Sequence, residues 1–172
     1  RLSSAASDVY KRQIRNQTEV LLRHIDEYQY DLVIGSSMGG LAAANASSLR
    51  EKSDFKLLLI APAFGLSDSW ENLTDEELDS WERMGVRRYR GFDLEIDLGW
   101  DFMEDAREMS WPTIRHQTTI IHGSKDDIVP LEVSQTVSED SELVDLIVID
   151  DGHRMKRSLS YLSDVASSLV SS

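Results

Sequence analysis

The hydrophobic positions along the chain follow two spacings in turn, and this alternation predicts an α/β fold. Apolar residues recur every three or four positions in some segments, which is typical of helices, and form short continuous runs in others, which is typical of buried parallel strands. The order of the segments favours a mostly parallel sheet with helices on both faces and right-handed crossovers. The predicted helices cover 14–28, 38–49, 130–137 and the segment after Gly152, and the predicted strands cover 31–34, 55–61, 118–122 and 144–149.

The segment 66–112 interrupts this alternation and predicts a small inserted helical cap. Thr74 and Glu77 have the spacing of a capping box, so a helix is expected to begin there and to end at Gly85. Later in the segment, apolar residues at every second position predict one half-buried strand or hairpin arm; these residues are Phe92, Leu94, Ile96 and Leu98.

Two groups of side chains in the cap allow two interpretations each. The basic cluster Arg87, Arg88 and Arg90 could attract an anionic substrate, but such clusters are more often solvated faces balanced by nearby acids. The tryptophans could line an acyl pocket, although burial against the main sheet is the commoner use; they are Trp70, Trp81 and Trp100.

Composition narrows the class of protein. The 172 residues have room for a single domain, expected over 14–172, and 18 basic against 31 acidic residues give a formal charge of −13. This charge argues against nucleic acid or an anionic membrane as a partner. The chain has no cysteine and no apolar run of membrane-spanning length, which favours a cytoplasmic protein. The four histidines are scattered without metal-ligand spacing, so neither a metal nor a cofactor is expected.

Three polar residues follow predicted strands in the order Ser, Asp, His. Gly35 to Gly39 reads GSSMG and fits G-x-S-x-G, with Ser37 at its centre, between a strand and a helix. Ser37 would be the nucleophile, His153 the general base that takes its proton, and Asp126 the acid that orients the imidazole. The backbone N–H of Met38 would donate to the oxyanion. The pattern predicts a serine hydrolase acting on a small-molecule acyl ester through an acyl-enzyme.

Each candidate has an alternative. Ser37 could be a small residue in a packing turn, while Ser36 is off the centre of the motif. Asp127 could replace Asp126 if the loop is offset by one residue. His153 could be an exposed loop histidine paired with a local acid, either Asp150 or Asp151. Two further histidines, His116 and His122, are interpreted as structural, and His24 as a surface residue.

With these residues in hand, the chain resembles the α/β-hydrolase superfamily and, within it, the small bacterial YqiA/YcfP-type esterases. Three segments carry the resemblance: LVIGSSMGG around Ser37, IIHGSKDDIVP from Ile120 to Pro130, and IDDGHRM from Ile149 to Met155. The spacing in the second segment matches the family's acid loop and favours Asp126. The resemblance implies the fold and an esterase activity; thioesterases and acyltransferases of this fold use the same groups, and a non-catalytic binding protein is the third hypothesis.

The beginning of the chain departs from that resemblance. Residues 3–13 back-translate to what looks like the adapter of a transposon-based sequencing kit, although an ordinary polar terminus is the alternative. The resemblance implies additional N-terminal strands and a His-Gly-type loop that supplies a second oxyanion donor. We therefore expect the strand at 31–34 to lack a neighbour and the chain as given to be poorly soluble or weakly active.

Overall fold

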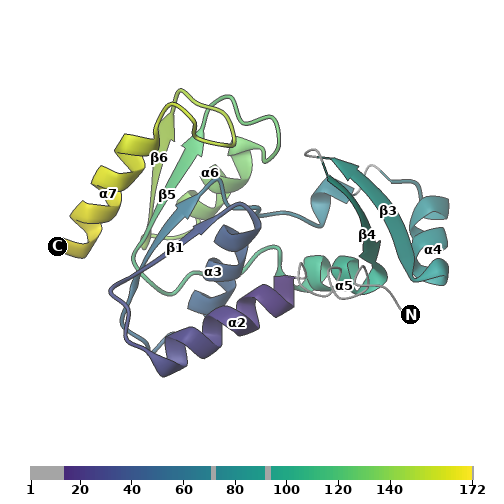
Figure 1. Cartoon of the computed structure of the whole chain (residues 1–172), viewed down its shortest axis with the longest axis horizontal. Helices are drawn as coiled ribbons and strands as arrows, with labels where there is room; N and C mark the ends of the chain where they lie inside the picture. Colours follow the sequence, from purple (N-terminus) through teal and green to yellow (C-terminus); the bar gives the residue numbers. More distant parts are fainter. Residues whose placement is uncertain (1–13, 71–72, 92–93, 172) are drawn as a thin grey trace.

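The four longest apolar segments form one parallel sheet. The computed structural model describes residues 14–70, 73–91 and 94–171. Its strands pair in the order β1-β2-β5-β6, all parallel (Figure 1). This confirms the predicted α/β class. The strands are β1 (Leu32–Ser36), β2 (Lys56–Ile60), β5 (Thr118–Gly123) and β6 (Val144–Ile149).

The parallel register brings the carboxyl ends of the strands to one edge. Ser36 at the end of β1 is level with Ile60 of β2, and Gly123 at the end of β5 is level with Ile149 of β6. The loops that follow these strands therefore emerge side by side, as is usual for functional loops of parallel sheets.

The helices between the strands complete the main layer. α3 (Met38–Leu49) packs on β1 and β2, and α6 (Leu131–Glu139) packs on β5 and β6. Because both crossovers step across the sheet in the same direction, the right-handed rule places α3 and α6 on the same face. α2 (Ile14–Glu27) lies against α3 rather than on the sheet.

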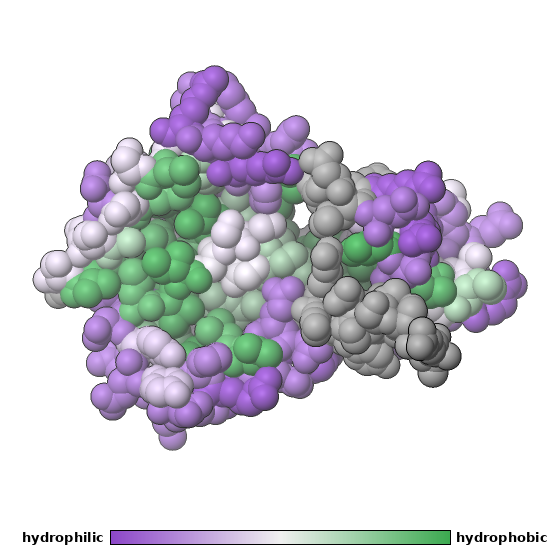
Figure 2. All heavy atoms as spheres, viewed as in Figure 1, coloured by the Kyte–Doolittle hydropathy of each residue, from purple (hydrophilic) through white to green (hydrophobic). Residues whose placement is uncertain are grey.

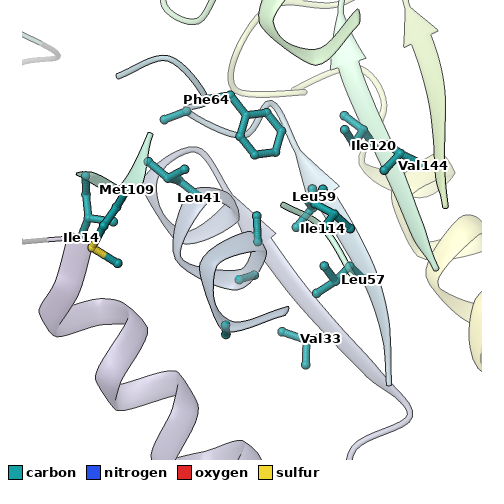
Figure 3. Close-up of a cluster of buried hydrophobic side chains, with 14 of the residues drawn as sticks. Ile14, Val33, Leu41, Leu57, Leu59, Phe64, Met109, Ile114, Ile120 and Val144 are labelled. Atoms are coloured by element: carbon teal, nitrogen blue, oxygen red, sulfur yellow. The ribbon is translucent and has the colours of Figure 1, made fainter. Parts of the chain in front are cut away.

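The main core lies between α3 and the sheet. Leu41 of α3, Leu57 and Leu59 of β2, and Ile120 of β5 are all fully buried there (Figure 3). The four alanines of α3 allow the helix to approach the strands closely, and they too are buried. Burial of this kind is the main favourable contribution to folding, and it fixes the strand ends that carry the loops.

The inserted cap contains both helices and strands. α4 (Asp75–Met84) begins with the predicted capping box, in which Thr74 Oγ1 accepts from the Glu77 N–H and the Glu77 carboxylate accepts from the Thr74 N–H. Gly85 ends this helix in the left-handed region at φ 71°. The rest of the cap is the 3₁₀ turn η1 (Asp68–Trp70), an antiparallel pair of β3 (Val86–Gly91) and β4 (Leu94–Gly99), and α5 (Trp100–Met109). The cap is thus helical in α4 and α5, with a hairpin added.

The cap has its own small core. Trp81 is 2% exposed and packs with Leu98, Phe102 and Met103. Its ring meets that of Trp100 edge to face at 5.5 Å. The expectation that Trp81 would pack against the main sheet is therefore wrong, because the hairpin and α5 provide closer apolar partners within the cap.

The basic cluster of the cap lies on β3 and is paired with acids. Arg88 bonds Asp97 at 3.2 Å and Arg90 bonds Glu95 at 3.0 Å, both across the hairpin, while Arg87 reaches Glu77 at 3.3 Å. These pairs identify the cluster as a charge-balanced, solvated face. An anionic substrate would have to compete with them.

One side of the sheet carries exposed apolar residues. Gly35 faces α3, so Ile34, which alternates with it, points to the opposite side and is 54% exposed. Val148 is 46% exposed, and Figure 2 shows apolar surface where the sheet and α7 lie. Among the described strands β1 is at an edge of the sheet, as expected. The predictions for residues 1–13 and for Phe92 fall outside the described residues.

The C-terminal helix is shorter than predicted. α7 (Leu159–Ser171) begins seven residues after Gly152, and the intervening segment is a loop in which Met155 is buried at 2% exposure. Leu162, Val165 and Leu169 of this helix are half-buried. Across 14–70, 73–91 and 94–171, no helix is long and apolar enough to cross a bilayer.

Candidate active site

Ser37 stands on a strained turn between β1 and α3. Its backbone has φ 53° and ψ −120°, a region that residues other than glycine rarely adopt. The chain can turn so sharply because Gly35 has no side chain. A methyl group at this position would collide with the Gly39 carbonyl, so only glycine fits there. As the first residue of α3, Met38 has an N–H without a partner inside the helix. The turn thus places a hydroxyl beside a backbone donor that has no partner within its own helix.

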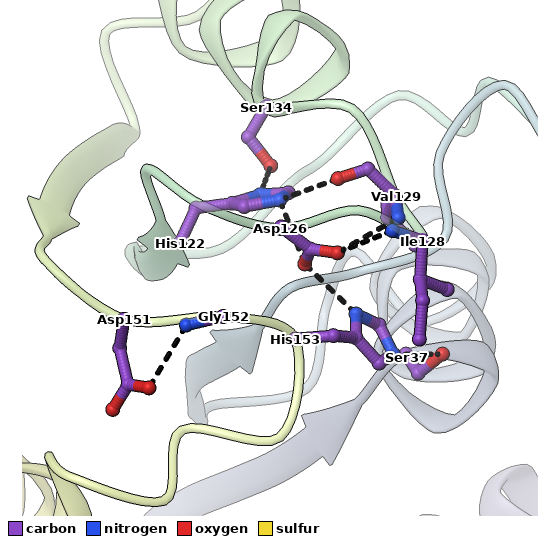
Figure 4. A network of polar contacts seen from close by, with 9 residues as sticks. All are labelled: Ser37, His122, Asp126, Ile128, Val129, Ser134, Asp151, Gly152 and His153. Atoms are coloured by element: carbon purple, nitrogen blue, oxygen red, sulfur yellow. Dashed lines mark hydrogen bonds and ion pairs between the residues drawn. The ribbon is translucent and has the colours of Figure 1, made fainter.

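His153 lies between Ser37 and Asp126 and forms a hydrogen bond with each of them (Figure 4). His153 Nε2 is 3.1 Å from Ser37 Oγ, and His153 Nδ1 is 2.8 Å from Asp126 Oδ2. Because the carboxylate can only accept, Nδ1 carries the proton and Nε2 accepts from the serine hydroxyl. The structure therefore brings the three sequence-predicted side chains together, across 116 residues between Ser37 and His153.

Asp126, and not Asp127, is the acid that contacts His153. The Asp126 carboxylate is fully buried, and its Oδ1 accepts hydrogen bonds from the N–H groups of Ile128 and Val129, both at 2.9 Å. Asp127 is exposed. A buried carboxylate held by two backbone donors keeps its second oxygen free to orient an imidazole.

The loop that carries His153 is held by Asp151. Its carboxylate accepts from the Gly152 N–H at 2.8 Å, from the Arg157 N–H at 2.8 Å and from the Ser158 hydroxyl at 2.9 Å. Burial alone would raise the pKa of Asp151, but these hydrogen bonds outweigh it and leave the pKa below its usual value. Asp151 therefore shapes the loop instead of pairing with the imidazole.

Gly123 allows the acid loop and the histidine loop to touch. A methyl group at this position would collide with the backbone carbonyl of Asp151. Lys125 closes the same contact, since its N–H donates to the Asp151 carbonyl at 3.0 Å and its ammonium group pairs with Asp150. Neither of the two local acids therefore bonds His153, which leaves its Nδ1 for Asp126.

An apolar cleft of about 650 Å³ opens at Ser37, between the sheet and the cap. The cap supplies one wall and the loops after β2 and β5 supply the other. Burial in this cleft raises the pKa of the Tyr89 phenol above its usual value, so the phenol stays neutral. The apolar lining is formed by Met38, Ala63, Phe64, Leu66, Trp70, Tyr89, Ile96, Leu98, Phe102, Ile128, Val129, Pro130 and Val133.

Sequence reasoning named the three candidate side chains that lie together here, but it missed most of the cleft. Tyr89 was missed because β3 reads as a charged stretch, whereas Ile96 and Leu98 were predicted on a half-buried strand but not as part of a cleft. Trp70 does line the cleft, as one of the two interpretations had it. His122 was interpreted as structural, yet its Nε2 lies 3.3 Å from Asp126 Oδ2. In the described ranges, no cluster of three or more acidic or histidine side chains could hold a metal ion.

Comparisons with known proteins agree with this fold. Alpha/beta hydrolase domain-containing protein 10 from mouse superposes with a TM-score of 0.78 at 22% identity, over 92% of this chain and 70% of that one. Est1E from Butyrivibrio proteoclasticus gives 0.70 at 17% identity, over 93% and 72%. An esterase from Exiguobacterium antarcticum gives 0.64 at 16% identity, over 95% and 76%. At these identities the likeness shows the α/β-hydrolase fold alone.

A search of curated proteins finds no match to this chain. A family model does match, over residues 3–169, and its description is "Uncharacterised protein family (UPF0227)". Because this match spans nearly the whole chain, the protein belongs to the UPF0227 family.

Proposed function

We propose that this protein is a serine hydrolase that cleaves carboxylic esters through an acyl-enzyme on Ser37. The observation that carries the proposal is the hydrogen-bonded line from Ser37 Oγ through His153 to the buried Asp126, which opens onto an apolar cleft. The nucleophile contacts the base, and the base contacts the orienting acid, which is the arrangement that acyl transfer needs.

The first half of the reaction forms the acyl-enzyme. Ser37 Oγ attacks the ester carbonyl carbon while His153 Nε2 takes the hydroxyl proton. The Met38 N–H donates to the oxyanion as the carbonyl oxygen becomes negative. The bond to the alcohol oxygen then breaks, and His153 gives its proton to that oxygen, so the alcohol leaves neutral.

The second half regenerates the serine. A water molecule attacks the acyl carbonyl, His153 takes one proton from it, and the bond between the acyl carbon and Ser37 Oγ breaks. His153 returns the proton to Ser37, and the carboxylic acid is released. Asp126 stays ionised throughout and stabilises the imidazolium that forms twice.

The cleft indicates which part of the ester is recognised. Its walls are mostly apolar, with Gln17 and Asp68 as further polar members beside Ser37, and its volume lies within the range of small-molecule sites. An apolar acyl group would bury surface there, while an anionic acyl group would lose hydration and find no Lys or Arg in the described lining. The structurally similar protein from Exiguobacterium antarcticum is an esterase, which supports the same class of substrate.

Labelling with a fluorophosphonate probe tests the proposal, because the probe reacts with an activated serine. The parent chain is expected to label and Ser37→Ala to lose labelling. Ser36→Ala is the matched control, since Ser36 is exposed at the end of β1 and is expected to label like the parent. Absence of labelling in the folded parent, or labelling that survives in Ser37→Ala, would refute a nucleophilic Ser37.

A further inference from the structure

A second cavity lies beside His153, and we propose that it binds the alcohol part of the ester through an anionic group, a phosphate or a carboxylate. The cavity has a volume of about 490 Å³ and is lined by residues of the loops that follow β5 and β6. Figure 2 shows hydrophilic surface over these loops, at the top of the view. The inference rests on the proposed function and deepens it, because it assigns the alcohol side of the same reaction.

The two cavities meet at the reactive side chains. Ile128 lines both of them, Ser37 lines the apolar cleft, and His153 lines the second cavity. The hydrogen bond of 3.1 Å between Ser37 Oγ and His153 Nε2 therefore connects the two cavities. Because His153 gives its proton to the alcohol oxygen, that oxygen must come within hydrogen-bond distance of Nε2. With the acyl group in the apolar cleft, the alcohol part would enter the cavity on the His153 side.

The second cavity differs from the apolar cleft in the charge of its lining. Four basic side chains line it against two carboxylates, Asp127 and Asp151, whereas the described lining of the apolar cleft contains no Lys or Arg. This local excess of positive charge stands in a chain of formal charge −13. Guanidinium and ammonium groups are the usual protein partners of phosphate and carboxylate. The four basic residues are Lys125, Arg154, Lys156 and Arg157.

Two of these cations have no close partner that would compete with a bound anion. In the parts of the chain that the structure describes, the side chains of Lys156 and Arg157 form no hydrogen bond or ion pair, and both are exposed. The charge of Arg157 acts on Asp151, but that carboxylate is held by donors of its own loop. Lys125, by contrast, pairs with Asp150. The basic cluster of the cap is also paired, since each of its three arginines contacts an acid.

The loop that carries the two cations has a fixed backbone. The Asp151 carboxylate accepts from the Arg157 N–H at 2.8 Å and from the Ser158 hydroxyl at 2.9 Å. Met155 is buried at 2% exposure with φ 47°, in a region that residues other than glycine rarely adopt, and its carbonyl accepts from the Ser158 N–H at 3.1 Å. This anchoring keeps Lys156 and Arg157 at the cavity instead of leaving them on a free loop.

The first test is the choice of alcohol by the parent protein. Four benzyl butyrates share one acyl group and differ only in the para group on the ring, which is a phosphate, a carboxylate, a carboxamide or a trimethylammonium group. We expect kcat/KM to be about tenfold higher for the preferred anionic ester than for the carboxamide ester, since two exposed ion pairs contribute about threefold each. The phosphate and carboxylate arms show which anion is bound, and added salt should weaken the preference.

The panel separates this inference from the proposed function. The net charge of −13 by itself would favour the trimethylammonium ester, so a preference for an anion cannot come from the charge of the whole protein. Release of the alcohol, followed by chromatography, reports formation of the acyl-enzyme even within a single turnover. Equal rates for the four esters, or a preference for the cationic one, would overturn the inference, while fluorophosphonate labelling of Ser37 would still support the function. An unlabelled parent would refute the function itself.

The second test removes the two cations. Lys156→Gln with Arg157→Gln should bring the anionic esters down to the kcat/KM of the carboxamide ester and leave the carboxamide ester at the parent rate. Lys156→Arg with Arg157→Lys keeps both charges and should keep the preference. Arg88→Gln with Arg90→Gln is the matched control, because it removes the same charge from the paired face of the cap, and it too should keep the preference.

Two results of the second test would contradict the inference. If the cap variant lost the preference as well, the effect would be one of net charge and not of the cavity. If Lys156→Gln with Arg157→Gln slowed all four esters equally, the loop would support the reactive groups without recognising the alcohol. Thermal melting of each variant monitors folding; should this double variant not fold, the choice of alcohol by the parent decides.

Discussion

The sheet and the inserted cap meet at one cleft, but they are built in different ways. The three candidate side chains all come from loops that follow parallel strands of the sheet, and their backbone is tied down by close contacts such as that of Gly123 with the Asp151 carbonyl. The cap has a small aromatic core and an outer face of cross-strand ion pairs. It brings to the cleft a wall that is almost entirely apolar.

This difference separates chemistry from recognition. Side chains that must stay within hydrogen-bond distance of one another need a rigid base, and the parallel sheet provides it. An apolar wall needs only shape and can change without moving the reactive groups. We therefore expect substitutions of the reactive groups on the sheet side to alter reactivity toward every ester, and substitutions in the cap to alter the choice of acyl group.

The largest effect is expected from the acid on the sheet side. Asp126→Asn should lower kcat by about 10⁴-fold, because an amide no longer favours the Nδ1–H tautomer of His153 or its charged form. Asp127→Asn is the matched control and should stay close to the parent, since Asp127 is exposed. Steady-state hydrolysis of a chromogenic ester gives both values. Comparable losses in the two variants would remove the distinction that the geometry makes between the neighbours.

A smaller and selective effect is expected from the cap. Trp70 lines the cleft and packs against Trp81, Tyr89 and Phe102, with ring centroids 5.3, 5.7 and 6.1 Å away. Trp70→Ala should lower kcat/KM for esters of longer apolar acids by about 10-fold or more, since apolar contact worth over 1.4 kcal/mol is lost. Acetyl esters, which do not reach the cap, should be hydrolysed at the parent rate.

The control for this variant is Trp111→Ala. Trp111 is 46% exposed, bonds Asp68 through its indole N–H, and is not part of the cleft lining. It should leave the preference among acyl groups unchanged. If Trp70→Ala instead slowed acetyl and longer esters equally, the cap would be shown to support the reactive groups, and the division between the two regions would fail.

The smallest effect concerns the pH dependence of stability. The pKa of Asp151 is lowered in the folded state, so its contribution to stability is present above the pKa of an unfolded aspartate, about 3.9, and is lost as pH falls through the folded value. Asp151→Asn should therefore lower the free energy of unfolding at neutral pH, and the gap to the parent should narrow in acid. Urea unfolding of the parent and of Asp151→Asn at neutral and at acidic pH measures this difference in free energy. A difference that does not change with pH would contradict this account.

Local patterns in the sequence were sufficient for most of the fold. The helix at Met38–Leu49 and the strand at Val144–Ile149 have the predicted bounds, and the capping box at Thr74 is formed. These features depend on neighbours in the chain, which a sequence shows directly. β3 was missed because its arginines are stabilised by acids on α4 and β4, and those partners become visible only when the hairpin is formed.

The sequence by itself determined the order of strands and helices in the main sheet layer, the turn that presents Ser37, and the position of an acid and a histidine after two later strands. The tertiary structure alone decided that Asp126 and not Asp127 bonds His153, that His122 reaches the same carboxylate, and that the cap encloses an apolar cleft. The physical reason is the separation along the chain over which each kind of interaction acts. Periodicity and turn chemistry act over a few residues, whereas contacts between groups up to 116 residues apart depend on how the strands are packed and on which side chains are buried.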